Sequence, residues 1–366
     1  MTGPVARRTV LHVDTERGWR GGERQALWLA GALAAAGHRS IVAARAGEPL
    51  ADRAGRAGLP VVPCNPLFEF DPAAVIALRR TIRREDVQIV HAHTAHAVSL
   101  AALATRGTGA RMVLTRRVDF RLRPNWGTRW KYGRADAIIA ISRAVADALV
   151  ASGIDPARIE IIPSGVDLTR VIAPAPRETI AALGVPAGAP LVVQVAQLVG
   201  HKDPVTFVRA IAAARRRVPA LHALMVGDGP LRGEVEAAVA ASGLREVVHL
   251  TGYRQDADAL LAAADVVTLS SKEEGLGTVL IDALSLGKPV AATAAGGIPE
   301  IIEDGRSGLL SPARDGERLG GAIASLLEDP ALAAKIAAGA RERARHFSVT
   351  RTAERTAAVY ERVLGG

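Results

Sequence analysis

The sequence predicts an α/β fold made of two doubly wound parallel sheets, one after the other along the chain. Short runs of Val, Ile and Leu alternate with Ala-rich stretches of helical periodicity. This alternation stops once, in the Pro- and Ala-rich residues 169–190, and then starts again. Because 366 residues can bury two separate cores, we expect two domains, each with helices on both faces of its sheet, and a cleft between them.

The strands and helices of the first half follow from local patterns. Residues 9–14, TVLHVD, form the first expected strand, and the helix at 23–37 ends at Gly37. A second amphipathic helix is expected at 73–85. The remaining strands are expected at residues 40–44, 59–64, 87–93, 110–115, 135–142 and 158–167.

The second half repeats the pattern. It opens with a strand at 191–198 and a helix from Pro204 to Arg217, and about the last 35 residues have helical periodicity. Later strands are expected at residues 222–229, 247–252, 265–270, 289–293 and 308–312. We therefore place an N-terminal domain at 1–168, a linker at 169–190, a C-terminal domain at 191–345 and a helix at 346–366 that packs back on the N-terminal domain.

Charge and cysteine content limit the partners and the compartment. Residues 1–170 hold 25 Lys and Arg against 15 Asp and Glu, whereas residues 171–366 hold 21 against 22. This asymmetry indicates an anionic partner for the first half. A single cysteine, Cys64, fits a reducing compartment. No apolar run approaches the ~20 residues of a membrane span and no signal-peptide pattern opens the chain, so we expect a cytoplasmic location.

The most suggestive motif lies between Glu274 and Glu300. Gly275 and Gly277 allow a tight turn after a strand, and the amides that follow begin a helix whose N-terminus favours anions. Glu274, expected at a surface-facing turn, and Asp282 would repel phosphate but accept hydrogen bonds from hydroxyl groups. A sugar joined to a diphosphate satisfies both preferences, although a single turn of this kind is more often an ordinary βα turn.

Other motifs extend this pattern along the chain. Gly287-Lys288-Pro289-Val290 and Gly296-Gly297-Ile298-Pro299-Glu300 follow the acid pair, and Ile162–Asp167 and Val226–Pro230 precede it. Together they resemble the nucleotide-sugar signature of glycosyltransferase family 4, whose members are retaining GT-B enzymes with two Rossmann-like domains. The resemblance covers nearly the whole chain and is densest in the second half.

The resemblance implies a role for each matching residue. Glu274 would contact the hydroxyls of the donor sugar, Asp282 would stand where a second Glu holds the ribose, and Lys202 would neutralise the leaving diphosphate. Gly21 and Gly22 resemble a loop that closes over that diphosphate, or they simply begin a helix. The implied donor-binding residues are Gly21, Gly22, Gln197, Lys202, Gly227, Gly252, Glu274, Gly275, Leu276, Gly277, Thr278 and Asp282.

Two positions depart from the family pattern. Ala196-Gln197-Leu198 replaces the usual Gly-Arg-Leu, which removes one phosphate-binding cation. Residues 115–119 stand where many members carry a histidine, and Arg116 or Arg117 could restore the lost charge. These changes indicate a rearranged site or an inactive one.

The stretch VHAHTAHAV holds three histidines, His91, His93 and His96. Two histidines at i and i+2 on a strand could bind a metal, but no fourth ligand lies near in the sequence and the resemblance implies no catalytic metal. We expect His93, at the carboxyl end of its strand, either to hydrogen-bond the acceptor or to pack in the core. Glu274, Lys202 and His93 form the expected catalytic set.

Residues 111–134, here called the basic-aromatic segment, hold eight cations against one acid, with aromatic residues between them. Such a mixture suits an anionic lipid surface, whereas a solvated loop is the plain alternative. No nucleic-acid-binding module accompanies it. The residues expected on the acceptor or membrane side are Arg116, Arg117, Arg121, Arg123, Trp126, Arg129, Trp130 and Lys131.

The resemblance, together with these observations, implies a retaining hexosyltransferase that uses a nucleoside-diphosphate sugar, with a UDP-sugar weakly favoured, and no cofactor or metal. The acceptor is expected to be lipid-linked or a cell-envelope glycan, and the enzyme to lie in the cytoplasm or on the cytoplasmic face of a membrane. A nucleotide-sugar epimerase on the same fold and a catalytically silent nucleotide-sugar sensor are the alternatives.

Overall fold

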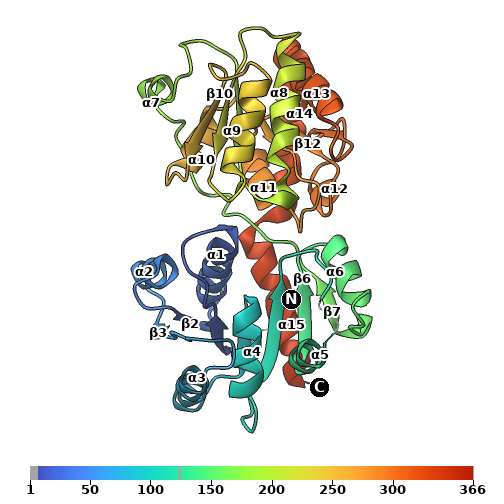
Figure 1. Cartoon of the computed structure of the whole chain (residues 1–366). Helices are drawn as coiled ribbons and strands as arrows, with labels where there is room; N and C mark the ends of the chain where they lie inside the picture. Colours follow the sequence, from blue (N-terminus) through green and yellow to red (C-terminus); the bar gives the residue numbers. More distant parts are fainter. Residues whose placement is uncertain (1–6, 123–124, 366) are drawn as a thin grey trace. The chain divides into compact units, whose positions relative to one another are not determined.

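The computed structural model describes residues 7–122 and 125–365, which form two units. Unit 1 comprises the residues up to Asp167 together with those from Ser348 onward, and unit 2 comprises Leu168–Phe347. Each unit has one parallel sheet with helices on both faces (Figure 1). The prediction of an α/β fold with two doubly wound sheets is therefore confirmed.

The sheet of unit 1 has the strand order β3-β2-β1-β4-β5-β6-β7, and its neighbouring strands are parallel. The direction of the order reverses between β1 and β4, and ligands of doubly wound sheets bind at the carboxyl ends of the strands at such a point. The strands are β1 (Thr9–Val13), β2 (Arg39–Ala44), β3 (Val61–Pro63), β4 (Ile89–Ala92), β5 (Arg111–Arg116), β6 (Ala137–Ala140) and β7 (Ile159–Ile161).

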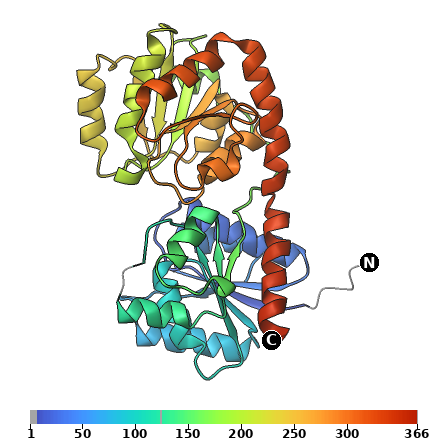
Figure 2. The same ribbon diagram turned by 90° about the vertical axis from the view of Figure 1, so that its right-hand side faces the viewer.

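One face of this sheet is covered by the first and the last helix of the chain. Tyr360 of α15 is fully buried and lies in one apolar cluster with Val10 of β1 and Leu33 of α1. Figure 2 shows α15 running along unit 1. The helices of this unit are α1 (Gly21–Ala35), α2 (Pro49–Arg56), α3 (Pro72–Arg84), α4 (Ala95–Ala104), α5 (Trp126–Gly133), α6 (Arg143–Val150), the 3₁₀ turn η1 (Pro156–Arg158) and α15 (Val349–Gly365).

The sheet of unit 2 has the order β10-β9-β8-β11-β12-β13, again with parallel neighbours. Its order reverses between β8 and β11, so the loops after these two strands lie at the switch point. The strands are β8 (Leu191–Val195), β9 (His222–Val226), β10 (Val248–Gly252), β11 (Val266–Leu269), β12 (Val290–Thr293) and β13 (Leu309–Ser311).

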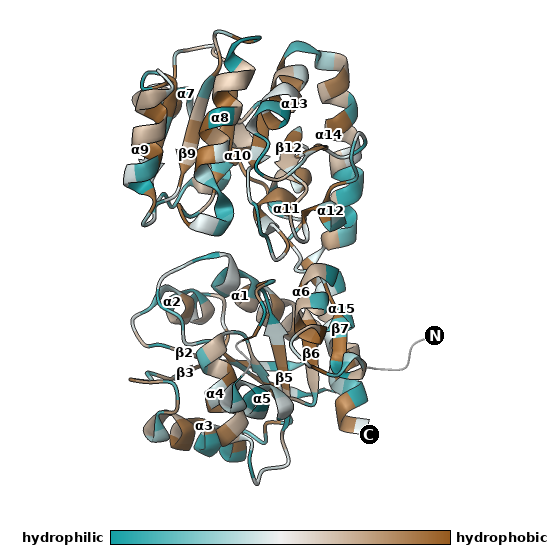
Figure 3. Cartoon of the chain, turned by 45° about the vertical axis from the view of Figure 1, so that its right-hand side comes forward, coloured by the Kyte–Doolittle hydropathy of each residue, from teal (hydrophilic) through white to brown (hydrophobic). Residues whose placement is uncertain are grey.

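The core of unit 2 forms where α8, α9 and α13 pack on the sheet. Phe207, Ile211 and Ile323 are fully buried there, and Figure 3 colours β9 and parts of α8 as hydrophobic. The helices are α7 (Arg177–Ala182), η2 (Gly200–Lys202), α8 (Pro204–Arg215), α9 (Arg232–Ala241), α10 (Ala257–Ala263), α11 (Thr278–Ser285), α12 (Ile298–Ile301), α13 (Gly316–Glu328), α14 (Pro330–Ala344) and η3 (Arg345–Phe347).

Two expectations differ from the structure. The expected strand at 158–167 shortens to β7, because Pro163 has no N–H to continue the ladder. The expected linker at 169–190 contains α7, and the amide of Ala175 donates to the carbonyl of Ala259 at 2.9 Å, which attaches this stretch to unit 2. Among the described residues, no helix is long and apolar enough to cross a membrane.

A glycine pair in α13 tests how tightly α8 and α13 pack. A Cβ on Gly320 would lie 2.4 Å from the carbonyl oxygen of Ala210 and 2.6 Å from the Cβ of Ala213, whereas a Cβ on Gly321 meets nothing within 4 Å. Gly320→Ala should lower the unfolding free energy by about 1–3 kcal/mol through overpacking. Gly321→Ala should raise it by about 0.5–1 kcal/mol. Urea denaturation of both variants measures this, and equal effects would contradict the packing.

Candidate functional site

The loops after β8 and β11 bring Lys202 and Glu274 together at the switch point of unit 2. The Nζ of Lys202 donates a hydrogen bond to Oε2 of Glu274, and Oγ of Ser271 donates to the same oxygen at 3.1 Å. Glu274 is only 8% exposed, so the expectation of a surface-facing carboxylate was wrong. A buried carboxylate needs a compensating cation, and Lys202 supplies it in this structure.

The turn that follows Glu274 is shaped by its backbone. The carbonyl of Glu274 accepts a hydrogen bond from the amide of Gly297 at 2.8 Å, which joins the acidic motif to the second glycine pair. Gly277 has φ +86°, a value that favours glycine, and it precedes the first residue of α11. Leu276 is 1% exposed, so its side chain packs inside unit 2. The turn therefore presents amides beside a carboxylate.

A second pair of loops lies next to this turn, after β8 and β9. Gly227 has φ +136°, and a Cβ there would lie 1.9 Å from the carbonyl oxygen of Ala196. The amide of Gly227 donates to the carbonyl of Gly252 at 2.9 Å. These two glycines shape the loop that carries Gln197, which is exposed. Asp282 of α11 is 3% exposed and thus more enclosed than a typical surface acid.

At the switch point of unit 1, a chain of hydrogen bonds links Arg117, His93 and His12. Nη2 of Arg117 lies 3.2 Å from Nδ1 of His93, and Nη1 donates to the carbonyl of His93 at 3.1 Å. Because a guanidinium only donates, Nδ1 of His93 accepts and its Nε2 carries the proton. That Nε2 donates to Nδ1 of His12 at 3.1 Å. The remaining proton of His12 is then on Nε2, which is buried without a partner among the described residues.

His91 connects this chain to the C-terminal helix. Its ring stacks on His93 with centroids 4.2 Å apart, and its two nitrogens lie 2.6 Å from the hydroxyl of Tyr360 and 2.7 Å from Oγ1 of Thr115. Burial lowers the pKa of His12 to about 3 and holds the pKa values of His91 and His93 well below their usual range. All three rings are therefore neutral near pH 7.

The three histidines have the composition of a metal site but not its usual surroundings. Their ligand atoms lie within 4.8 Å of one another. However, both nitrogens of His91 and of His93 already have hydrogen-bond partners, and the Arg117 cation contacts His93. The arrangement suits a hydrogen-bonded stack better than a metal site. His96, which the sequence grouped with His91 and His93, is exposed, and His12 takes its place.

Asp14 is a site residue that the sequence analysis missed. It follows β1 directly, is 2% exposed, and its Oδ1 accepts from the amide of Glu16 at 3.1 Å. Burial raises the pKa of Asp14 to about 7, and the nearby Glu23 adds to this, while the Glu16 hydrogen bond and Arg117 oppose it. Its Oδ2 is buried with no partner among the described residues. The sequence did contain a signal for Asp14, because an acidic residue at the carboxyl end of the first strand lies where doubly wound sheets bind ligands.

Gly21 and Gly22 are the first two residues of α1. The expectation that they form a loop was therefore wrong, and the alternative, that they begin a helix, is confirmed. The amide of Arg20 donates to a carboxylate oxygen of Glu23 at 2.7 Å and caps the helix. A Cβ on Gly22 would lie 4.0 Å from Cδ of Arg117, so Arg117 passes close to the start of α1.

The basic-aromatic segment divides into internal and outward-facing residues. Arg116 donates to the carbonyls of Val118 at 3.1 Å and Phe120 at 2.8 Å and to the hydroxyl of Tyr132 at 3.0 Å. Lys131 pairs with Glu69 at 2.6 Å. These two cations hold unit 1 together, which corrects their expected place on a binding surface. Arg121, Trp126 and Arg129 are exposed, Trp130 stacks on Trp126, and Arg123 lies outside the described residues.

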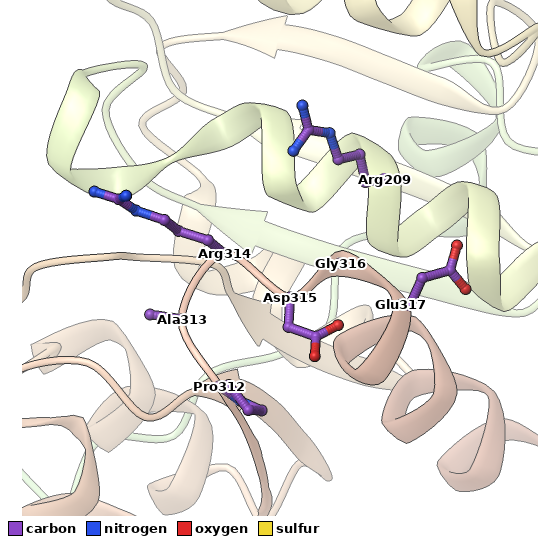
Figure 4. A pocket seen from close by; sticks show the side chains of 7 residues that line it. All are labelled: Arg209, Pro312, Ala313, Arg314, Asp315, Gly316 and Glu317. Carbon is purple, nitrogen blue, oxygen red and sulfur yellow. The ribbon is translucent and has the colours of Figure 1, made fainter.

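A pocket of about 470 Å³ lies elsewhere in unit 2, between α8 and the turn before α13 (Figure 4). Its lining residues are Arg209 and Pro312–Glu317, which do not include Lys202 or Glu274. The carboxylate of Asp315 accepts from the amide of Arg318 at 2.9 Å and so caps α13. We therefore attribute this pocket to the shape of the turn that precedes α13.

Comparison with known proteins identifies the family. Residues 19–170 match the model described as Glycosyltransferase Family 4, and residues 177–343 match Glycosyl transferases group 1. Alpha-maltose-1-phosphate synthase of Mycolicibacterium smegmatis is 31% identical over 316 residues, which cover 76% of this chain and 80% of that protein. The chain belongs to glycosyltransferase family 4. This glycosyltransferase is also 32% identical to a D-inositol 3-phosphate glycosyltransferase of Kineococcus radiotolerans, over 78% of this chain and 68% of that protein.

Solved structures of other proteins have a fold similar to that of this chain. Anabaena HepE, crystallised with UDP-glucose, gives a TM-score of 0.83 at 24% identity, covering 96% of this chain and 98% of HepE. Sucrose-phosphate synthase from Thermosynechococcus elongatus gives 0.76 at 21% identity, covering 98% of this chain and 100% of that one. Both support the GT-B fold, and the predictions of family, fold and transferase class are confirmed.

The raised pKa of Asp14 predicts a pH-dependent stability. The native state binds its proton more tightly than the unfolded state, so stability falls as the pH rises between about 4 and 7. Asp14→Asn removes this dependence. Its unfolding free energy should rise relative to wild type across that range, by at most about 1.4 kcal/mol per pH unit. Denaturation at several pH values measures the difference, with the exposed Asp52→Asn as control. A constant difference would contradict a protonated Asp14.

Proposed function

We propose that this glycosyltransferase is a retaining enzyme that moves a hexose-type sugar from a nucleoside-diphosphate sugar, with a UDP-sugar favoured. The proposed acceptor is lipid-linked or a cell-envelope glycan, and the proposed location is the cytoplasm. The observation that carries the proposal is the Lys202–Glu274 pair at the switch point of unit 2. An ammonium group binds phosphate and a carboxylate accepts hydrogen bonds from hydroxyls, which are the two ends of a sugar diphosphate.

In the proposed complex, each member of the pair exchanges its partner. Lys202 turns to the diphosphate, and Glu274 accepts hydrogen bonds from the sugar hydroxyls. Lys202 gains the phosphate charge and Glu274 gains hydroxyl donors, so both groups stay hydrogen-bonded when the pair opens. The amides at the start of α11 add donors for the phosphate or the sugar. Asp282, on the same helix, is assigned to the ribose.

The proposed reaction keeps the configuration of the anomeric carbon. The bond from this carbon to the diphosphate oxygen breaks, and its electron pair leaves with the oxygen, where Lys202 stabilises the growing charge. The acceptor hydroxyl attacks from the same face and gives its proton to that departing oxygen. No carboxylate acts as a nucleophile, because Glu274 holds the sugar. The proposed chemistry needs no metal.

We assign the acceptor to the switch point of unit 1. His93 and Arg117 lie there beside two buried polar atoms without partners among the described residues, Nε2 of His12 and Oδ2 of Asp14. A hydroxylated acceptor would offer both kinds of hydrogen bond to such groups. Similar proteins are named for maltose 1-phosphate, inositol 3-phosphate and 2-deoxystreptamine, which differ in charge, so their names do not decide the acceptor of this enzyme.

A direct assay tests the proposal. The purified enzyme, treated with a chelator, is incubated with a panel of nucleoside-diphosphate hexoses and water-soluble glycosides, and the product is examined by proton NMR. We expect transfer with retained anomeric configuration from at least one donor, at a rate that the chelator leaves unchanged. An inverted product would overturn the mechanism. A product with an epimerised sugar and no transfer would favour the epimerase alternative.

The role of Glu274 has a matched control beside it. Glu274→Gln keeps the side-chain volume but removes the charge that accepts hydroxyl hydrogen bonds, so turnover should fall at least about tenfold. The neighbouring Glu273 is exposed, and Glu273→Gln should leave turnover unchanged. Both rates are measured on variants whose thermal unfolding has been recorded, because Glu274→Gln also leaves Lys202 without its partner. Normal turnover in a folded Glu274→Gln enzyme would remove the carboxylate from the mechanism.

A further inference from the structure

The loop between β3 and α3 holds large apolar side chains in solvent. Leu67, Phe68 and Phe70 are 87%, 58% and 43% exposed. The loop backbone is nevertheless fixed, because Oδ2 of Asp71 accepts from the amide of Leu67 at 2.9 Å and Arg45 donates to the carbonyl of Pro66 at 2.7 Å. These apolar side chains are therefore presented by an ordered loop.

A second apolar group comes from the basic-aromatic segment. Trp126, at the start of α5, is 79% exposed, and Phe120 is 44% exposed. The rings of Trp126 and Trp130 stack with centroids 6.4 Å apart. An exposed tryptophan supported by a second ring is typical of a contact surface and not of a packed core.

Glu69 ties the two apolar groups to one side of unit 1. Its Oε1 accepts from Nζ of Lys131 in α5 at 2.6 Å and from Oγ of Ser99 in α4 at 2.7 Å. The loop and α5 are thus joined through side chains, and both follow the carboxyl end of a strand of the same sheet. Figure 1 shows α3, α4 and α5 on one side of this sheet.

Cations accompany the apolar side chains. Arg121 and Arg129 of the basic-aromatic segment are exposed. On α3, the 50% exposed Ile76 is followed by exposed Arg80 and Arg83, at helical spacings of four and seven that place all three on one face. Glu69, an acid within this area, is already paired with Lys131. The combination of apolar side chains and cations complements an anionic lipid surface.

We propose that Leu67, Phe68, Phe70, Phe120 and Trp126 form an insertion surface that docks unit 1 on an anionic membrane. The apolar side chains enter the headgroup region, while Arg80, Arg83, Arg121 and Arg129 contact lipid phosphates. The surface uses none of the residues assigned to the reaction. Its test is therefore independent of the proposed donor chemistry.

The test uses the whole purified chain and sedimenting vesicles. At low salt, we expect it to bind vesicles containing phosphatidylglycerol and not vesicles of phosphatidylcholine alone, and to be released at 1 M salt, where screening shortens to ~3 Å. Insertion should also shift the tryptophan emission to the blue, and Trp126→Phe should remove most of that shift. Binding without a shift would overturn insertion.

Matched variants distinguish binding through the insertion surface from nonspecific binding of exposed apolar side chains to vesicles. Leu67→Ser combined with Phe68→Ser should weaken partitioning about tenfold. The control pair is Val171→Ser with Tyr253→Ser, because these residues of unit 2 are 97% and 61% exposed. This control should bind like the wild type. Turnover on a water-soluble acceptor should be unchanged in both variants.

The cations are tested in the same way. Arg80→Gln combined with Arg83→Gln should weaken binding to anionic vesicles about tenfold. The reason is that each of the two cations contributes a similar share of the attraction to the anionic lipids. The control pair is Arg314→Gln with Lys335→Gln, at exposed positions of unit 2, and it should bind anionic vesicles like the wild type. Equal losses in test and control pairs would overturn the proposal. So would self-association in lipid-free solution that the Leu67/Phe68 variant abolishes without any change in vesicle binding, since the surface would then bind a second copy of the chain.

Discussion

The buried carboxylate of Glu274 is the constraint on which the arrangement of unit 2 depends. A carboxylate that is 8% exposed must be compensated, and the loop after β8 brings the Lys202 cation to it. This requires Lys202 to close η2, Ser271 to donate to the same oxygen, and the backbone of the turn to be held by the amide of Gly297. The same interactions fix the Glu274 carboxylate and the Lys202 ammonium group on which the proposed donor site depends.

The two units place different chemistry at equivalent points of their sheets. In unit 2, the switch point holds an ion pair, which suits a ligand that carries both charge and hydroxyl groups. In unit 1, it holds neutral histidines, one guanidinium and a carboxyl group whose pKa is raised to about 7. In unit 1, burial lowers the pKa of His12 and raises the pKa of Asp14, whereas in unit 2 the buried Glu274 has Lys202 as a direct partner. A polar ligand with little charge would fit such surroundings.

The excess cations of the first half of the chain have two different roles in the structure. Some of its cations hold unit 1 together, as Arg116 and Lys131 do, and these gain buried or half-buried partners. Others, such as Arg80 and Arg129, are exposed. A count of charges predicts an anionic partner but cannot assign these two roles. The hydrogen bonds of each guanidinium or ammonium group assign them.

The sequence by itself determined the alternation of strands and helices, the two-domain α/β fold and the glycine-rich turn around Glu274. These depend on periodicity and on backbone conformations such as the positive φ of Gly277, which are local properties. Only the tertiary structure decided that Glu274 pairs with Lys202, that Tyr360 contacts His91, and that His12 replaces His96 in the histidine group. Tyr360 and His91 are 269 residues apart, and no local pattern encodes a contact that exists only once α15 has packed on the sheet.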